Sequence, residues 1–269
     1  MRPAGETPKS QIPPTPQALA RPRRSVAKSG PNPKRIWLLL GFGIWVLGFI
    51  AAQPAVDAAG RLVMFRAADG RTLTGLLIEA ESRPSAAVVL VPMLGRSRDD
   101  WQLVAQRLAD ASISALAIDL PGDVIPGAPE ALTAWHQDVG AAVAFLASRP
   151  ADVRAGAIGV AGASLGANLA AVAAAADPAI RSIALVSPSL DYRGVRLEEP
   201  MRAYGGRPAL LIASLQDPYS ARSVRELAQG APGTREVRWS TIPGHGTLLL
   251  QRDADLIRSL VEWFQLTLA

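Results

Sequence analysis

Cysteine is absent from the 269-residue sequence, and histidine occurs only twice, at His136 and His245. The lack of cysteine excludes a disulfide framework, a thiolate metal site and a cysteine nucleophile. Two histidines provide few ligands for a histidine-based metal site. We therefore expect a protein that works without a metal or any other cofactor.

Lysine is absent beyond residue 34, and the remaining charge is unevenly distributed. Residues 1–35 hold eight Lys and Arg against the single acid Glu6, which gives that segment a net charge of +7. The rest of the chain has 20 basic and 22 acidic residues, so its net charge is −2 within a total of +5. The body of the protein therefore offers no basic surface for nucleic acid, and the positive charge needs a local explanation.

The N-terminal tail has no apolar periodicity. Residues 1–34 contain eight prolines. Such a segment buries too little apolar surface to offset the entropy of its chain. We expect residues 1–35 to be disordered.

Charge is absent from the segment that follows, residues 36–56. Its first part, IWLLLGFGIWVLGFIAA, is almost wholly apolar. Its 21 residues rise about 31 Å as a helix, close to the thickness of a bilayer core. We expect an uncleaved transmembrane signal-anchor. The basic tail before it places the N-terminus in the cytoplasm and the body outside, on the periplasmic side of the inner membrane in a bacterium.

Two other interpretations of residues 36–56 stay open. A cleaved signal peptide would release an exported soluble body. Val56-Asp57-Ala58 is a tolerable cleavage site for it, and Arg23-Arg24 weakly resembles a twin-arginine signal. The apolar run is long for such a peptide. The remaining interpretation, a buried core helix, is disfavoured because the run is apolar on all sides and follows a basic tail.

Residues 61–269 alternate between strand and helix patterns and predict a single α/β domain. Two apolar stretches flank Asp69-Gly70, which is a hairpin signal. Short apolar runs predict strands at 86–93, 113–120, 155–162, 182–187 and 208–215, with a polar edge strand at 235–242. Helical patterns cover 98–110, 130–148, 165–176, 219–229 and 248–268. Repeated β-α units predict a mostly parallel sheet with helices on both faces.

A serine lies where one predicted strand turns into a helix. The sequence there is Gly162-Ala163-Ser164-Leu165-Gly166. This is the strand–turn–helix context of a nucleophile elbow, in which a sharp turn exposes a strained serine and leaves no room for side chains two residues away. The pattern alone is weak, since a glycine-rich turn can contain an incidental serine.

Two further polar residues follow predicted strands in a consistent order. Asp217 comes after the strand at 208–215, and His245 comes between the last strand and the last helix. Ser164, Asp217 and His245 are separated by 53 and 28 residues, in the chain order of serine hydrolases with this strand pattern. Asp191 is the alternative acid, and we interpret His136 as a packing or surface residue of a helix.

These motifs together make residues 61–269 resemble the α/β-hydrolase fold superfamily, in particular compact serine esterases like dienelactone hydrolase. Two further segments carry the resemblance: 91–101, similar to the family's loop after the third strand, and 117–122, similar to its loop after the fourth. The resemblance implies a Ser164-His245-Asp217 triad, with the backbone N–H groups of Leu165 and of Leu94 or Met93 binding the oxyanion. Pro92 replaces a residue of the family pattern, and proline has no N–H to donate.

The function implied is hydrolysis of a small-molecule carboxylic ester by acyl transfer through Ser164. A peptidase, a thioesterase or an acyltransferase on the same triad stays open, as does a non-catalytic module of this fold. Only about 20 residues, 188–207, are available for a lid, so we expect an open and shallow site.

Overall fold

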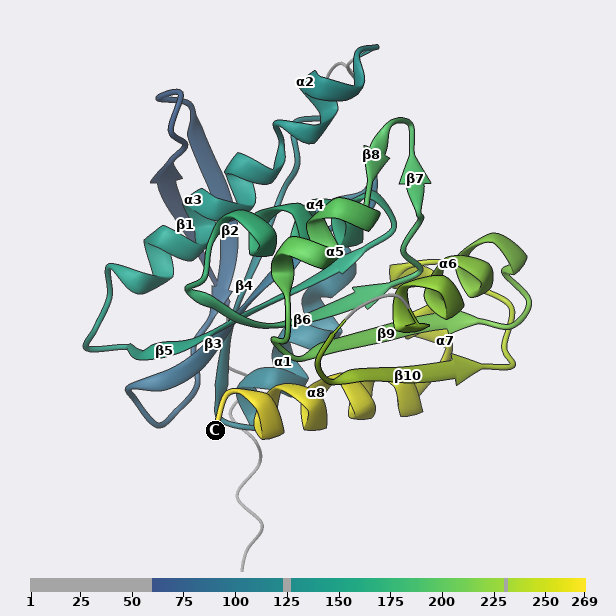
Figure 1. Ribbon diagram of the computed structural model, residues 1–269. Helices are drawn as coiled ribbons and strands as arrows, with labels where there is room; N and C mark the ends of the chain where they lie inside the picture. Colours follow the sequence, from purple (N-terminus) through teal and green to yellow (C-terminus); the bar gives the residue numbers. More distant parts are fainter. Residues whose placement is uncertain (1–59, 123–126, 230–231) are drawn as a thin grey trace, which may run out of the picture. The chain divides into compact units, whose positions relative to one another are not determined.

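The computed structural model describes residues 60–122, 127–229 and 232–269 (Figure 1). The predicted disordered tail, 1–35, and the predicted anchor, 36–56, lie outside these residues, as does the cleavage site considered for them. Among the described residues, no helix is both long enough and apolar enough to cross a bilayer.

One sheet of eight strands forms the centre of the body, in the order β1-β2-β4-β3-β5-β6-β9-β10. Its strands are β1 (Arg61–Arg66), β2 (Thr72–Ile78), β3 (Ser85–Val91), β4 (Ile113–Ile118), β5 (Val153–Ala163), β6 (Ile180–Val186), β9 (Ala209–Ser214) and β10 (Arg235–Ser240). A small hairpin, β7 (Asp191–Tyr192) and β8 (Val195–Arg196), stands apart from this sheet.

The helices alternate with these strands. They are the 3₁₀ helix η1 (Arg98–Trp101), then α1 (Gln102–Asp110), α2 (Pro129–Thr133), α3 (His136–Ala147), α4 (Leu165–Ala176), α5 (Glu198–Tyr204), α6 (Pro218–Gln229), α7 (Thr247–Arg252) and α8 (Ala254–Thr267).

Strand direction follows the predicted pattern. From β4 to β10 all neighbours are parallel, whereas β1 and β2 pair antiparallel around the turn at Asp69-Gly70 and β2 pairs antiparallel with β4. β10, the most polar strand, lies at an edge as predicted. Parallel strands bring their carboxyl ends to one edge of the sheet, and Ser164, Asp217 and His245 all follow strands at this edge.

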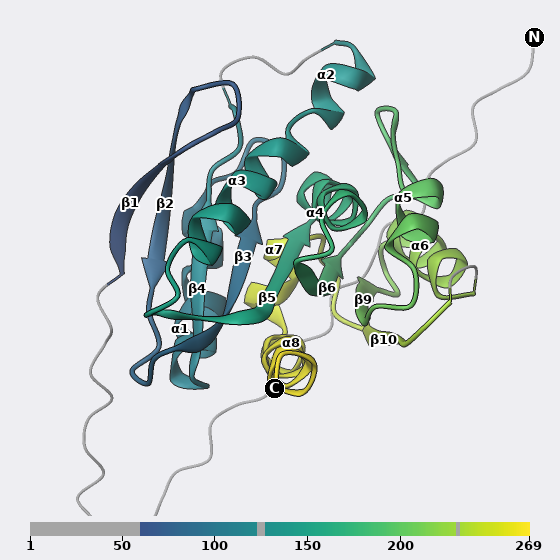
Figure 2. The ribbon, with the colours of Figure 1, turned by 60° about the vertical axis from the view of Figure 1, so that its left-hand side comes forward.

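Helices cover both faces of the sheet (Figure 2). One core lies under α3 and α4 and includes Val89, Leu169 and Leu185. The other lies under α1 and α8 and includes Leu90, Trp101 and Phe264. All seven residues of β3 are buried, because the strand carries apolar side chains on both faces. The predicted α/β class with helices on both faces is confirmed.

Two predicted helices are each divided into two. The segment 130–148 contains α2 and α3, and the chain tightens into i→i−3 hydrogen bonds around Trp135, whose side chain is buried. The segment 248–268 contains α7 and α8. Asp253 is extended there (φ −129°, ψ 93°), and its carboxylate accepts a hydrogen bond from the N–H of Asp255, so it begins a new helix as an N-cap. β7, β8 and α5 had no counterpart among the predicted elements.

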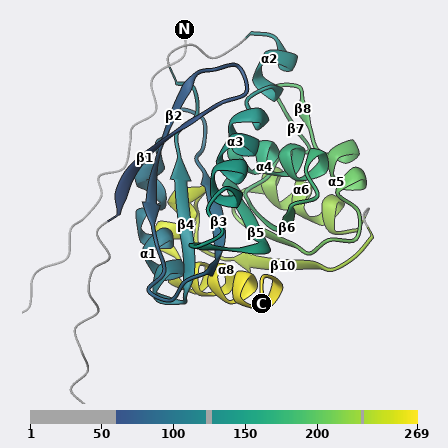
Figure 3. The same cartoon turned by 90° about the vertical axis from the view of Figure 1, so that its left-hand side faces the viewer.

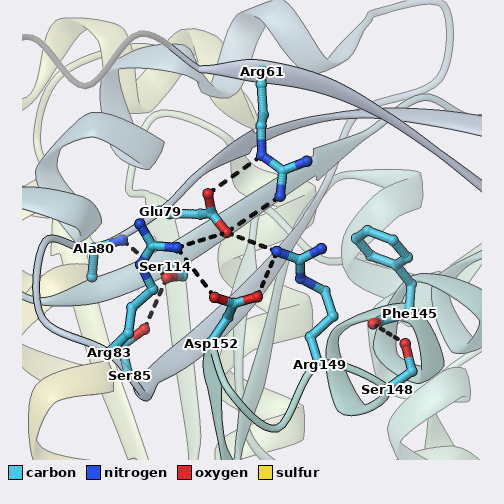
Figure 4. Close-up of polar contacts among 10 residues, drawn as sticks. All are labelled: Arg61, Glu79, Ala80, Arg83, Ser85, Ser114, Phe145, Ser148, Arg149 and Asp152. Carbon is cyan, nitrogen blue, oxygen red and sulfur yellow. Dashed lines mark hydrogen bonds and ion pairs between the residues drawn. The ribbon is translucent and has the colours of Figure 1, made fainter.

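An ion cluster lies at the opposite edge, where the parallel strands begin (Figure 4). The Glu79 carboxylate accepts hydrogen bonds from Arg61 and Arg149. Asp152 accepts from Arg149 and Arg83. This cluster ties β1 and β2 to the segment before β5.

Candidate active site

Ser164 occupies the sharp turn between β5 and α4, with φ 52° and ψ −120°. The residues two positions before and two positions after it must be glycine on steric grounds. A Cβ on Gly162 would lie 2.1 Å from the carbonyl oxygen of Gly166, and one on Gly166 would lie 2.4 Å from that of Pro92. The Ser164 N–H donates to the carbonyl of Val186 at 2.9 Å, which fixes the turn to β6. The predicted strained elbow is therefore present.

The fold brings the three residues of the predicted triad together. Nε2 of His245 lies 2.8 Å from Oγ of Ser164, and Nδ1 lies 2.6 Å from Oδ2 of Asp217. An ionised carboxylate only accepts hydrogen bonds, so Nδ1 carries the proton and Nε2 is left to accept from the serine hydroxyl. The three residues follow β5, β9 and β10, at one edge of the sheet.

Asp217 has a second donor besides the histidine. Oγ of Ser220 donates to Oδ2 at 2.6 Å, and the N–H of Ser220 donates to Oδ1 at 3.2 Å. Burial raises the pKa of Asp217, but the hydrogen bonds from His245 and Ser220 together outweigh burial and hold the pKa below its usual value. Asp217 is therefore ionised at neutral pH and can stabilise a protonated imidazole.

Unpaired backbone donors lie beside the serine. Leu165, the first residue of α4, is fully buried, and its N–H has no acceptor among the described residues. The N–H groups of Met93 and Leu94 likewise donate to no described residue. Leu165 is the most deeply buried of the three, and buried donors without partners are rare in folded proteins. Free N–H groups on the two segments that flank Ser164 suit the binding of an oxyanion.

The site is open on the histidine side. Ser164 is only 6% exposed, whereas the His245 side chain is 45% exposed. Four exposed apolar residues lie within three positions of Asp217 or His245 in the chain: Leu215, Tyr219, Ile242 and Leu248. Among the described residues, no group of three or more His, Asp or Glu side chains is placed to hold a metal ion.

Several solved structures share the fold of the body. A dienelactone hydrolase from Anabaena variabilis is 18% identical with a TM-score of 0.68, covering 79% of this chain and 100% of that one. The esterase domain of a Rhodothermus marinus protein is 17% identical with a TM-score of 0.64, covering 78% and 100%. An esterase from Pyrococcus furiosus is 17% identical with a TM-score of 0.65, covering 78% and 93%. The chain has the α/β-hydrolase fold. No protein-family model matches the sequence. No curated protein matches it significantly either.

Within this α/β-hydrolase fold, the alternative site residues lie elsewhere. The Asp191 carboxylate is paired with Arg196 and with the N–H of Gly194, whereas Nδ1 of His245 is hydrogen-bonded to Asp217. His136 is the first residue of α3, whereas the predicted helix 130–148 would place it in mid-helix, and its Nδ1 lies 2.7 Å from the carbonyl of Thr133. The structure therefore places Asp217, and not Asp191, against the histidine.

The segment available for a lid, 188–207, folds as the β7–β8 hairpin and α5. Asn168, one turn after Ser164 on α4, is fully buried and holds this segment. Its amide nitrogen donates to the carbonyls of Ser189 and Val195, and its oxygen accepts from the N–H of Ser189. The hairpin is thus fixed to the same helix that positions the nucleophile.

Three supporting contacts had no signal in the sequence. Oγ of Ser187 accepts the Gly246 N–H at 2.9 Å, directly after the histidine. The hydroxyl of Thr247 donates to Asp100, which also pairs with Arg96. The Arg96 guanidinium holds the pKa of Asp100 below its usual value. The Thr247–Asp100 hydrogen bond links the loop that carries the candidate donors to the residues directly after His245, and Arg96 pairs with Asp100 within that first loop.

Proposed function

We propose that this protein is a serine hydrolase that cleaves carboxylic esters. The observation that carries the proposal is the continuous hydrogen-bonded series Ser164–His245–Asp217, with distances of 2.8 Å and 2.6 Å, at a strained nucleophile elbow. The solved structures of similar fold include a dienelactone hydrolase and two esterases, which supports the same class of reaction here.

Hydrolysis proceeds in two steps. Oγ of Ser164 attacks the ester carbonyl while Nε2 of His245 takes its proton, and the imidazolium then gives that proton to the leaving alcohol. A water molecule, activated by the same histidine, attacks the acyl-serine and releases the acid. Asp217 keeps the Nδ1 proton in place and stabilises the positive charge on the ring in both steps.

The tetrahedral oxyanion is bound by the N–H of Leu165 and a second N–H from Leu94 or Met93, with Leu94 the favoured donor. Each such donor lowers the barrier by roughly 3 kcal/mol in comparable sites. An open site next to the half-exposed His245 favours small, water-accessible esters over long acyl chains that need a deep tunnel.

Residues 36–56 form, in this proposal, an uncleaved anchor in the inner membrane, with the hydrolase on the periplasmic side. The support is the sequence alone: an uncharged 21-residue run after a segment of net charge +7.

Activity-based labelling tests the catalytic part of the proposal. A fluorophosphonate probe should label the folded protein at Ser164, and Ser164→Ala should abolish labelling and lower kcat on p-nitrophenyl acetate by about 10⁴-fold or more. Ser148→Ala, which changes an exposed serine on the protein surface, should leave both unchanged. Absence of labelling in the folded protein would show a non-catalytic module.

A second set of substrates separates reactions on the same triad. A series of p-nitrophenyl esters of increasing chain length should show the highest kcat/KM for short acyl groups. An acyltransferase would instead show transfer to an added alcohol exceeding hydrolysis. A peptidase or thioesterase would be labelled but would prefer amides or thioesters.

A further inference from the structure

The edge strand β1 carries apolar side chains on its outer face. Val63 and Phe65 point into the core, where they are 6% and 8% exposed. Leu62 and Met64 alternate with them and are 67% and 73% exposed. A half-buried edge strand usually places polar side chains at its solvent-facing positions. The two side chains therefore indicate that something covers this face.

The outer face continues onto β2. Leu62 is opposite Leu76, and Met64 is opposite Thr74, whose hydroxyl accepts a hydrogen bond from Arg98. The figures show β1 at the end of the sheet, with β2 between it and the rest (Figure 3). We call Leu62, Met64, Leu76 and Arg66 the β1 face.

Acidic residues are missing from the β1 face. The positions of β1 and β2 on this side are apolar, threonine or Arg66, and none is Asp or Glu. The Arg66 guanidinium donates to the carbonyl of Gly70 and has no carboxylate partner among the described residues. Apolar side chains rimmed by arginine and threonine match the boundary between lipid headgroups and acyl chains.

The length of the chain before β1 limits where this face can be. The uncharged run ends at Val56, and β1 begins at Arg61. Five residue steps reach at most about 18 Å when fully extended. If residues 36–56 cross the bilayer, the start of β1 stays within that distance of the lipid surface. Leu62 is the next residue.

We propose that the β1 face lies against the membrane that anchors the chain, with Leu62 and Met64 inserted among the lipid headgroups. This inference rests on the anchoring part of the proposed function. It adds a second, reversible contact that fixes the orientation of the body on the membrane.

The absence of cysteine makes a direct test possible, because a single introduced cysteine is the only thiol for labelling. Full-length Met64→Cys, labelled with an environment-sensitive fluorophore, is reconstituted into vesicles of phosphatidylethanolamine and phosphatidylglycerol that contain nitroxide-labelled lipid. Tyr219→Cys is the control. Tyr219 is 54% exposed and lies on α6, next to strands about 30 Å from β1 at the spacing of strands in a sheet.

Lipid contact predicts quenching at position 64 at least twofold stronger than at position 219. Adding Leu62→Asp, which places a charge on the exposed face, should reduce that difference. Protein that floats with the vesicles but shows equal, weak quenching at both positions would overturn the docking and leave the anchor intact. Protein that does not float would overturn both. Efficient disulfide formation between two Met64→Cys copies would show that a second copy covers the face instead.

Discussion

At the scale of single residues, the Asp217 carboxylate is hydrogen-bonded both to His245 and to the first turn of α6. Its Oδ2 accepts from His245 and from the hydroxyl of Ser220, while its Oδ1 accepts the Ser220 N–H at the start of α6. The carboxylate is thus both the acid of the proposed triad and the N-cap of a helix that begins with Pro218. Because the helix fixes Ser220, that hydroxyl holds the carboxylate in the orientation that faces His245.

Ser220→Ala should lower kcat/KM about tenfold, because the Asp217 carboxylate loses the hydroxyl donor that holds it in the orientation facing His245. Loss of this donor raises the pKa of Asp217. A carboxylate with one donor fewer stabilises the protonated imidazole more strongly, so the acid limb of the kcat/KM profile should move to higher pH. Ser223→Ala, one turn later on α6, should leave that limb in place. An unchanged profile in Ser220→Ala would limit the serine to helix capping.

Some residues of the candidate site could be predicted from the sequence and others could not. Ser164, Asp217 and His245 could be predicted because each follows a recognisable strand and the three occur in a fixed order. The roles of Ser220, Ser187 and Thr247 could not be predicted. No local motif marks these residues, and their hydrogen-bond partners come close only in the folded chain. From the sequence alone, Asp191 and Asp217 were both candidates for the acid. The structure distinguishes them because the His245 ring is hydrogen-bonded to Asp217.

At the scale of elements, the strands were more predictable than the helix boundaries. The central strands β3, β4 and β9 are mostly apolar runs that are buried along their whole length, and β10 at the sheet edge is polar, as its sequence predicts. The helices 130–148 and 248–268 are interrupted for tertiary reasons. Trp135 turns into the core, and Asp253 is held by the hydroxyl of Ser240 at 2.5 Å. β7 and β8 have two residues each and depend on Asn168.

The ion cluster that ties β1 and β2 to the segment before β5 gives an element-scale prediction (Figure 4). Burial raises the pKa of Glu79, but Arg61, Arg83 and Arg149 outweigh it and hold the pKa below the usual value. Glu79→Gln removes the charge that these arginines share, so it should lower the free energy of unfolding by about 1 to 2 kcal/mol at pH 7.

The pH dependence of that loss follows from the direction of the shift. A carboxyl with a lowered pKa in the folded state stabilises the fold above its unfolded pKa, and this contribution disappears as pH falls through the folded pKa. Denaturant unfolding should therefore separate wild type from Glu79→Gln at pH 7, with the difference shrinking below about pH 4. Glu198→Gln breaks a pair in which the glutamate is 86% exposed and should change stability by less than about 0.5 kcal/mol. Equal losses in the two variants at pH 7 would show that the cluster adds nothing beyond a surface pair.

At the scale of the whole molecule, the positive charge is concentrated in the N-terminal tail, and the body is nearly neutral. A net charge of +7 precedes the uncharged run, and −2 belongs to the body that carries the triad. Basic residues before a membrane span are retained in the cytoplasm, so under the proposed anchoring this charge would specify orientation and not a binding partner. In the proposed topology, a nearly neutral hydrolase on the periplasmic side would meet small solutes without strong attraction to either sign of charge.

Single-cysteine labelling in intact bacterial cells tests this topology, again because the chain has no native thiol. Ser25→Cys lies in the tail and Ser82→Cys at an exposed position of the body. A maleimide that enters the periplasm but does not cross the inner membrane should label position 82 in intact cells and position 25 only after lysis. Labelling of position 25 in intact cells would reverse the orientation. A soluble periplasmic product that lacks position 25 but is labelled at position 82 would identify residues 36–56 as a cleaved signal peptide, and the lipid contact of the β1 face would then have no anchor to support it.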